Sequence, residues 1–211
     1  MTQLEAELKL ENSMDKSQVQ ETLKRMLEAD LQKRQELIER GELFEGYHPE
    51  MEAIHAANTK RLEEIISDFG FPTLRRVGEE AAEAAWLVVM HSVGNPPFMR
   101  NVLALLKGSE YEGEIEPRQL AYLEDRIRVL SGQTQIYGTQ FDWDENGVLS
   151  PAPLAYPEQV DELRRSIGLP SLAEQTERMR ERVRQKGDTP PTDPLAWKEK
   201  SEEWAKKVGW L

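Results

Sequence analysis

The sequence predicts a mainly α-helical fold: a single-domain bundle of seven or eight helices, with a small β-hairpin or extended segment near 133–153. Three observations predict it. Apolar residues recur every three or four positions through most of the chain, which is the spacing of a helix face. Glycine and proline separate these stretches. Residues 133–153 lose the helical period and contain the strong turn signal Asp144-Glu145-Asn146-Gly147.

The first two helices are expected to open at Ser17 and at Pro49. Ser17 and Gln20 have the spacing of a capping box, and Gly41 is placed to end the first helix. The apolar face of the first helix is expected to consist of Val19, Leu23, Met26, Leu27, Leu31 and Ile38. The face of the second is expected to consist of Met51, Ile54, Leu62, Ile65 and Ile66.

A third helix is expected at 78–91, in the centre of the bundle. It carries alanine at four positions between 81 and 85, and small side chains let neighbouring helices approach closely. Five further helices are expected, each bounded by proline or glycine: 98–108, 117–132, 157–167, 171–186 and 195–211. The domain plan is therefore a flexible N-terminus (1–15), a helical domain (16–186), a Pro-rich linker (187–194) and a docked amphipathic C-terminal helix (195–211).

Composition excludes several kinds of function. The chain has no cysteine, which rules out disulfides, thiolate zinc sites and cysteine nucleophiles. Its net charge of −12 opposes binding to nucleic acid or to an anionic membrane. One basic cluster stands out, but acidic residues dilute it and a solvated helix face explains it: Arg178, Arg180, Arg182, Arg184 and Lys186. No signal peptide or membrane span is recognisable, so we expect a cytoplasmic protein.

Histidine is the residue type with the most candidate chemistry. Glu52 and His55 form one Glu-x-x-His pair, but a di-iron bundle needs a second, and Val88 stands three positions before His91. We therefore expect no metal site and no cofactor. His91 ends a very apolar helix, where the helix dipole favours an imidazolium. It is either a structural helix-end residue, or a general base or substrate ligand.

Two polar elements follow. Asp125 and Arg126 lie inside an expected helix, and because adjacent positions point about 100° apart, one of them has to reach inward. This pair either pins the following loop or binds an anionic ligand. The loop itself is rich in hydrogen-bonding side chains: Gln135, Tyr137, Thr139 and Gln140. It is suited to hold a small polar ligand, or to satisfy its own backbone.

The most specific elements are Tyr122-Leu123-Glu124-Asp125-Arg126 and Gln135-Ile136-Tyr137-Gly138-Thr139-Gln140. Together with segments 43–49, 77–91 and 160–170, they resemble a family of bacterial proteins of unknown function. The resemblance implies no activity, but it implies that one set of residues belongs together: Trp86, His91, Asp125, Arg126, Gln135, Tyr137, Gly138, Thr139 and Gln140. Met90 and Met99 depart from the pattern, which has glutamine at both places.

Two functions fit these observations. The first is a module that binds a small polar ligand or a protein partner in a cleft formed by His91, Asp125, Arg126 and the loop 135–140. The alternative is a small cofactor-independent enzyme with His91 as general base and Asp125 or Arg126 orienting it. Trp197, Trp204 and Trp210 are expected to dock on their own chain, because they are too much apolar surface to leave in water, and a homodimer through the C-terminal helix is the alternative.

Overall fold

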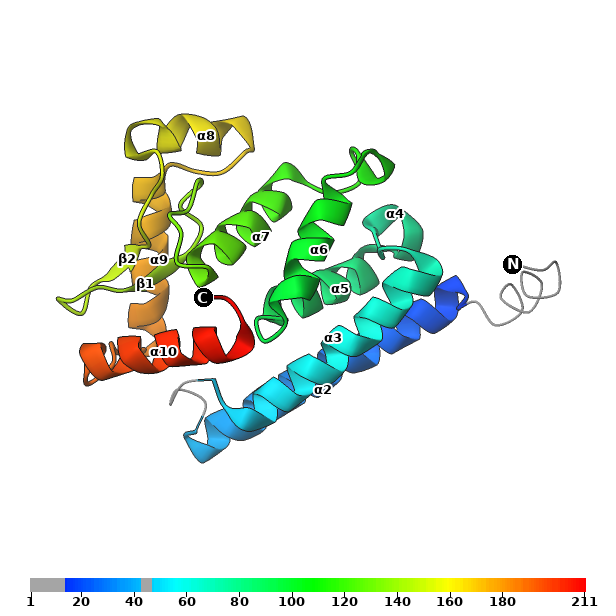
Figure 1. The fold of residues 1–211 in the computed structure, drawn as a ribbon, viewed down its shortest axis with the longest axis horizontal. Coiled ribbons are helices and arrows are strands. Elements are labelled where there is room, and N and C mark those ends of the chain that lie inside the picture. The colour runs from blue at the N-terminus through cyan, green and yellow to red at the C-terminus, as the bar shows by residue number, and fades with distance from the viewer. Residues whose placement is uncertain (1–13, 43–46) are drawn as a thin grey trace. The chain divides into compact units, whose positions relative to one another are not determined.

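The computed structural model describes residues 14–42 and 47–211. The predicted mainly α fold with a small β-hairpin is confirmed (Figure 1). The helices in the described residues are α2 (Lys16–Arg40), α3 (Pro49–Phe69), α4 (Leu74–Val77), α5 (Glu79–His91), α6 (Pro96–Leu106), α7 (Pro117–Leu130), α8 (Val160–Ser166), α9 (Leu172–Lys186) and α10 (Pro194–Val208). The four-residue α4 is the one that the sequence did not predict. Most of the predicted N-terminus 1–15 and part of segment 43–49 lie outside the described residues.

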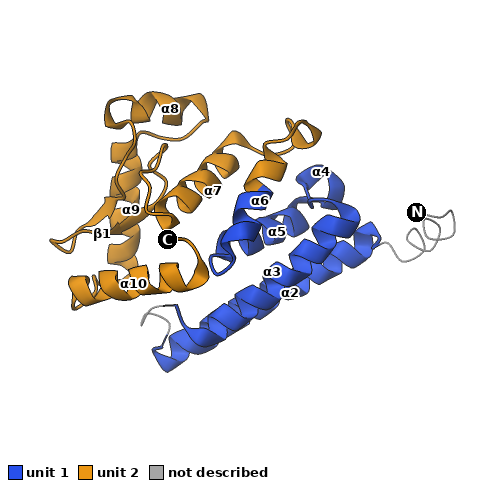
Figure 2. Ribbon diagram, viewed as in Figure 1, with its two compact units in different colours: residues 1–102 blue, residues 103–211 orange. Residues whose placement is uncertain are grey.

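The chain divides into two compact units, the first ending at Val102 and the second beginning at Leu103, within α6 (Figure 2). In the first unit, α2 and α3 form a long antiparallel pair, and α5 packs against both (Figure 1). The predicted boundaries at 186 and 194 stay a prediction. Every helix in the described part of the chain is too short or too polar to cross a membrane.

The start of α2 differs from the expected one. Asp15, not Ser17, is the N-cap: its carboxylate accepts a hydrogen bond from the Gln18 amide, and the Gln18 side chain accepts one from the Asp15 amide. This is a capping box shifted by two residues, and aspartate satisfies the exposed amides as well as serine does. The expected end at Gly41 is confirmed, because Gly41 adopts a left-handed conformation with φ of 72°.

The buried face of α2 also differs from the expected one. Leu31 and Ile38 are 56% and 40% exposed, so their predicted place in the core is wrong. The buried residues are instead Val19, Leu23, Met26, Asp30 and Leu37. These positions repeat at steps of four and three, with one position skipped before Leu37, which is the heptad spacing of two helices packed along their length. A carboxylate therefore occupies a core position of α2.

The same spacing runs along α3. Its buried residues include Met51, Asn58, Leu62 and Ile65, and His55 lies at the intervening position, four residues after Met51 and three before Asn58. The Asn58 side chain donates to the Met26 carbonyl of α2 over 3.2 Å. Ile54 and Ile66, predicted for this face, are only half-buried. Both long helices thus carry polar groups in their shared apolar seam.

In α5, Ala81, Ala84, Ala85, Val88 and Val89 are buried. The helix contacts α2, α3 and α4, in agreement with its expected central position in this unit. Small side chains allow the close approach, and the helix runs until His91, its last residue. The end of α5 therefore carries an imidazole to the seam between α2 and α3.

The second unit contains the hairpin. Strands β1 (Phe141–Trp143) and β2 (Leu149–Pro151) pair antiparallel, with Asp142 opposite Ser150. The Asp144 carboxylate accepts hydrogen bonds from the Asn146 and Val148 amides and so closes the turn. Helix α9 contacts β2, and α8 contacts α9. Pro117 opens α7 and a Ser171–Glu174 capping box opens α9, both as predicted.

Candidate functional site

The predicted site residues fall in different units. His91 belongs to the first unit, whereas Asp125, Arg126 and the loop 135–140 belong to the second. Their predicted role as one ligand site stays a prediction. Within each unit, the two groups of residues have very different hydrogen-bond partners.

In the second unit, Asp125 is fully buried and its carboxylate is surrounded by donors. It accepts hydrogen bonds from the backbone amides of Ile136, Tyr137 and Thr139 and from the Thr139 hydroxyl, over distances between 2.7 and 3.2 Å. Backbone amides of one short loop thus donate the hydrogen bonds to Asp125 that water would donate at the surface. The arrangement pins the loop to α7.

Gln135 fixes the same loop to the hairpin. Its side chain is fully buried, donates to the carbonyls of Gln140 (3.0 Å) and Ala152 (2.7 Å), and accepts from the Gln140 amide (2.9 Å). Three of the four hydrogen-bonding positions of this amide are therefore occupied by backbone groups.

Arg126 and Tyr137 are half-buried, and burial together with the nearby charges of Glu124 and Asp125 raises the pKa of Tyr137.

Arg164 of α8 completes this network, and sequence reasoning missed it. Its guanidinium is 1% exposed and donates to the carbonyls of Tyr137 (2.6 Å), Gly138 (3.1 Å) and Pro170 (2.7 Å). Burial lowers its pKa. The sequence contains one signal: the apolar residue Val160 stands four positions earlier and hence on the same helix face as Arg164. Val160 is also buried. We call Asp125, Gln135 and Arg164 the loop clamp.

The loop passes close to its neighbours at Gly138. Its φ is +66°, and a Cβ atom there would lie 2.7 Å from Leu172 Cδ1 and 3.4 Å from Leu154 Cδ2. Both the backbone conformation and the lack of space require glycine. The backbone of the Tyr-Gly-Thr-Gln element thus lies directly against the side chains of Leu172 and Leu154 at Gly138.

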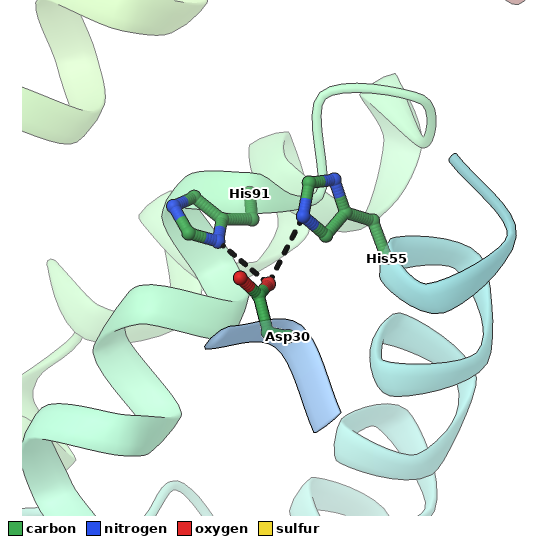
Figure 3. Close-up of side chains that lie close together, drawn as sticks. All are labelled: Asp30, His55 and His91. Atoms are coloured by element: carbon green, nitrogen blue, oxygen red, sulfur yellow. Dashed lines mark hydrogen bonds and ion pairs between the residues drawn. The ribbon is translucent and has the colours of Figure 1, made fainter. Parts of the chain in front are cut away.

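In the first unit, His91 meets two residues from other helices: Asp30 of α2 and His55 of α3 (Figure 3). His91 Nδ1 lies 2.9 Å from Asp30 Oδ2, within hydrogen-bond distance. His55 Nε2 lies 3.0 Å from the same oxygen. We call these three residues the His–Asp cluster. Three helices of the first unit converge on one carboxylate oxygen.

The two imidazoles are held differently. His55 Nδ1 lies 2.7 Å from the Tyr47 hydroxyl, which orients the ring, and Nε2 faces the carboxylate. Although Nε2 is buried and near Asp30, its alignment is not that of a hydrogen bond, and no described group bonds it. The side chain of His55 is 11% exposed, against 36% for His91. The buried Nε2 therefore faces the Asp30 carboxylate without an aligned hydrogen bond.

Asp30 is charged in this environment. Burial by itself would raise its pKa, but the close contacts of its carboxylate with the His55 and His91 rings and the charges of these imidazoles outweigh it, so that the pKa lies well below its usual range. A carboxylate that stays ionised in a helix seam has to be paired, and among the described residues the His55 and His91 imidazoles pair with it.

A pocket opens beside His55. It has a volume of about 190 Å³, and its wall includes Tyr47, Glu52, Lys60, Glu63 and Asn95. Thr59 and Ser92, which also contribute to the wall, lie within hydrogen-bond distance of each other (2.7 Å) and connect α3 to the end of α5. The pair fixes the helix turns that carry His55 and His91. The pocket is smaller than the 300–1,000 Å³ typical of drug-sized ligands, so it suits a very small molecule or ion.

Two groups in the described residues have the composition of a metal site. In the His–Asp cluster the three ligand atoms lie within 4.8 Å of one another. In the second, Glu42, His48 and Glu50, cations already neutralise the acids: Arg40 pairs with Glu42 and Glu50, and Lys33 pairs with Glu50. The hydrogen bonds with Arg40 and Lys33 lower the pKa of Glu50 to about 2. The second group is a half-buried ion-pair network.

Sequence reasoning found His91 but missed Asp30 and Tyr47, and it weighed His55 only together with Glu52. Asp30 and His55 could have been found from the heptad steps of their helices, because each occupies a position where the pattern demands an apolar residue. The expected carboxylate partner of His91, by contrast, was sought at Asp125. The partner in its own unit is Asp30.

Comparison with known proteins gives a family but no activity. A family model described as a family of unknown function (DUF6624) matches residues 17–185. No curated protein and no solved structure matches the chain. The alternative of a general-base enzyme therefore gains no support from relatives.

Proposed function

We propose that this chain, which belongs to the DUF6624 family, binds a small polar ligand of positive charge in the first-unit pocket beside His55. The observation that carries the proposal is the pocket itself: a small open hollow lined by His55, whose inner nitrogen faces the ionised, buried Asp30 carboxylate without an aligned hydrogen bond. Such convergence of polar groups in a concave place is the usual mark of a binding site.

The charge of the wall supports a cationic ligand. Glu52 and Glu63 contribute two carboxylates, Lys60 one ammonium group, and Asp30 adds a negative charge beside His55. The chain as a whole carries a net charge of −12, which attracts cations from solution. An anionic ligand would meet unfavourable charge both near and far from the site.

The contacts of the loop 135–140 support a structural role for it. The carboxylate of Asp125 and the amide of Gln135 already hold backbone groups, so a ligand would have to displace them. The ligand contacts predicted for Tyr137, Thr139, Gln140 and Arg126 stay predictions, as do the bacterial origin and the cytoplasmic location. Our proposal moves the site to the first unit, where His55 is part of the pocket wall and Asp30 connects it to His91.

The test is a titration of ¹⁵N-labelled protein, followed by amide chemical shifts. Ethanolamine is the cationic probe, and acetate and glycerol are the anionic and neutral probes. We expect ethanolamine to shift the amides of Ser92, Gly94 and Asn95, which belong to the pocket wall, more than either other probe does.

Two variants on α3 sharpen this test. Both alanines are exposed, but Ala56 lies in the pocket wall and the neighbouring Ala57 does not. Ala56→Leu should fill the pocket and abolish the shifts, and Ala57→Leu should leave them unchanged. Equal response to all three probes, or shifts that persist in Ala56→Leu, would show that this pocket is not the binding site.

A further inference from the structure

We infer that the His–Asp cluster is a binding site for a divalent transition-metal ion, held by Asp30 Oδ2, His55 Nε2 and His91 Nδ1. This inference rests on the proposed function, since it names the cation that the acidic region beside His55 would take. Nothing in the sequence predicted it, because the ligands come from three separate helices and follow no metal motif.

The spacing of the donors fits such an ion. The carboxylate oxygen lies 2.9 Å from one imidazole nitrogen and 3.0 Å from the other. Metal–ligand bonds of about 2.1 Å at right angles place neighbouring donors about 3.0 Å apart. The third pair of donors, the two nitrogens, lies within 4.8 Å. A small movement of the two imidazole rings toward each other is enough for all three donors to bind one ion.

The state of His55 is the second, independent observation. Without a metal, its buried Nε2 makes no aligned hydrogen bond and lies 3.0 Å from Asp30 Oδ2, although a buried polar atom is normally hydrogen-bonded. With a metal, Nε2 directs its lone pair to the ion, while Nδ1–H donates to the Tyr47 oxygen 2.7 Å away. An outer partner of this kind fixes the tautomer and orientation of metal-binding histidines in general.

The donor types restrict the ion. Two imidazoles and one carboxylate suit zinc, nickel, cobalt or iron(II), whereas magnesium and calcium prefer sites made of oxygen alone. Three protein ligands leave at least one coordination position for water or another small molecule. The pocket is lined by His55, one of the three donors, and has the size for such a molecule.

The experiment is calorimetric titration of the full-length, untagged protein with Zn²⁺ and with Ni²⁺, in metal-free buffer. We expect one ion per chain with micromolar or tighter affinity. His55→Gln, His91→Gln and Asp30→Asn should each weaken binding at least 100-fold. The matched control is His48→Gln, which removes the remaining histidine, in the ion-pair network with Glu42 and Glu50, and should leave the affinity unchanged.

A measurement on the unmutated protein covers the case in which a variant fails to fold. Imidazole ¹⁵N shifts should change on adding Zn²⁺ at His55 Nε2 and His91 Nδ1, and not at His48. The inference would be overturned if neither ion binds, or if binding is lost only in His48→Gln. If ethanolamine still shifts the pocket amides in that case, the proposed function stands without the metal; if it does not, both are wrong.

Discussion

Asp30 and Asp125 are both buried aspartates on helices, yet their surroundings have little in common. Asp125 accepts hydrogen bonds from three backbone amides and one hydroxyl, all from residues 136–139. Asp30 has two imidazoles from two other helices, one of which is not aligned to bond it. The first environment is complete with the chain's own backbone. The second is complete only if a proton or another cation joins the imidazoles and the carboxylate.

The difference shows how a structural carboxylate can be told from one held for a ligand. A structural carboxylate holds the backbone, because backbone groups cannot leave without unfolding the loop. A carboxylate that faces titratable, metal-binding side chains next to a pocket keeps contacts that a ligand can replace. We therefore expect substitutions at Asp125 to act on stability, and those at Asp30 to act on binding.

The largest effect is expected for Asp125→Ala. It leaves the buried amides of Ile136, Tyr137 and Thr139 without an acceptor and should lower the free energy of unfolding by about 3–5 kcal/mol. Thermal unfolding followed by circular dichroism measures the loss. Glu162→Ala, at an exposed position of α8, is the control and should change stability by less than about 0.5 kcal/mol. A small loss of stability in Asp125→Ala would contradict the structural role of Asp125.

An intermediate effect is expected for Arg164→Met. The buried carbonyls of Tyr137, Gly138 and Pro170 lose their donor, while the cost of burying a charge disappears, so we expect a loss of about 2–3 kcal/mol. The matched control is Arg165→Met, because the next residue is exposed. Urea unfolding gives both values, and equal stability of the two variants would mean that Arg164 does not hold the loop.

The smallest effect is expected for Asp30→Leu, in the absence of metal. Leucine restores the apolar heptad step of α2 and gains about 1.5–3 kcal/mol from burial, which offsets the lost charged hydrogen bonds of about the same size. The net change should lie within about 1 kcal/mol by urea unfolding. Leu23→Asp, which puts a carboxylate at a fully buried position of the same seam, should cost several times more. A large loss in Asp30→Leu would make Asp30 as structural as Asp125.

Much of the fold could be predicted because its boundaries depend on local chemistry. Gly41 ends α2, Pro49 and Pro117 open α3 and α7, and Ser171 caps α9, each through a rule that involves a few adjacent residues. The buried face of α2 was predicted wrongly because a choice between Asp30 and Leu31 cannot be made on hydrophobicity alone. The partners on α3 and α5 decide it.

The candidate site was harder to predict than the helices that carry it. His91 could be identified from its place at a helix end, but its carboxylate partner stands 61 positions earlier in the chain. Arg164 looks like its exposed neighbour Arg165 in the sequence, and the helix phase of Val160 is the one local difference. Contacts between distant segments depend on packing, which no short pattern contains.

The loop clamp has a consequence for how freely this protein can change. At Ile136 and Tyr137, the hydrogen bonds of Asp125 and Arg164 involve peptide amides and a carbonyl, and every residue but proline provides both groups. The path of the loop is therefore independent of the side chains presented at those two positions. Such a segment can accept mutations at its surface while its backbone stays in place, so these positions offer a stable platform on which new recognition properties can be selected or designed.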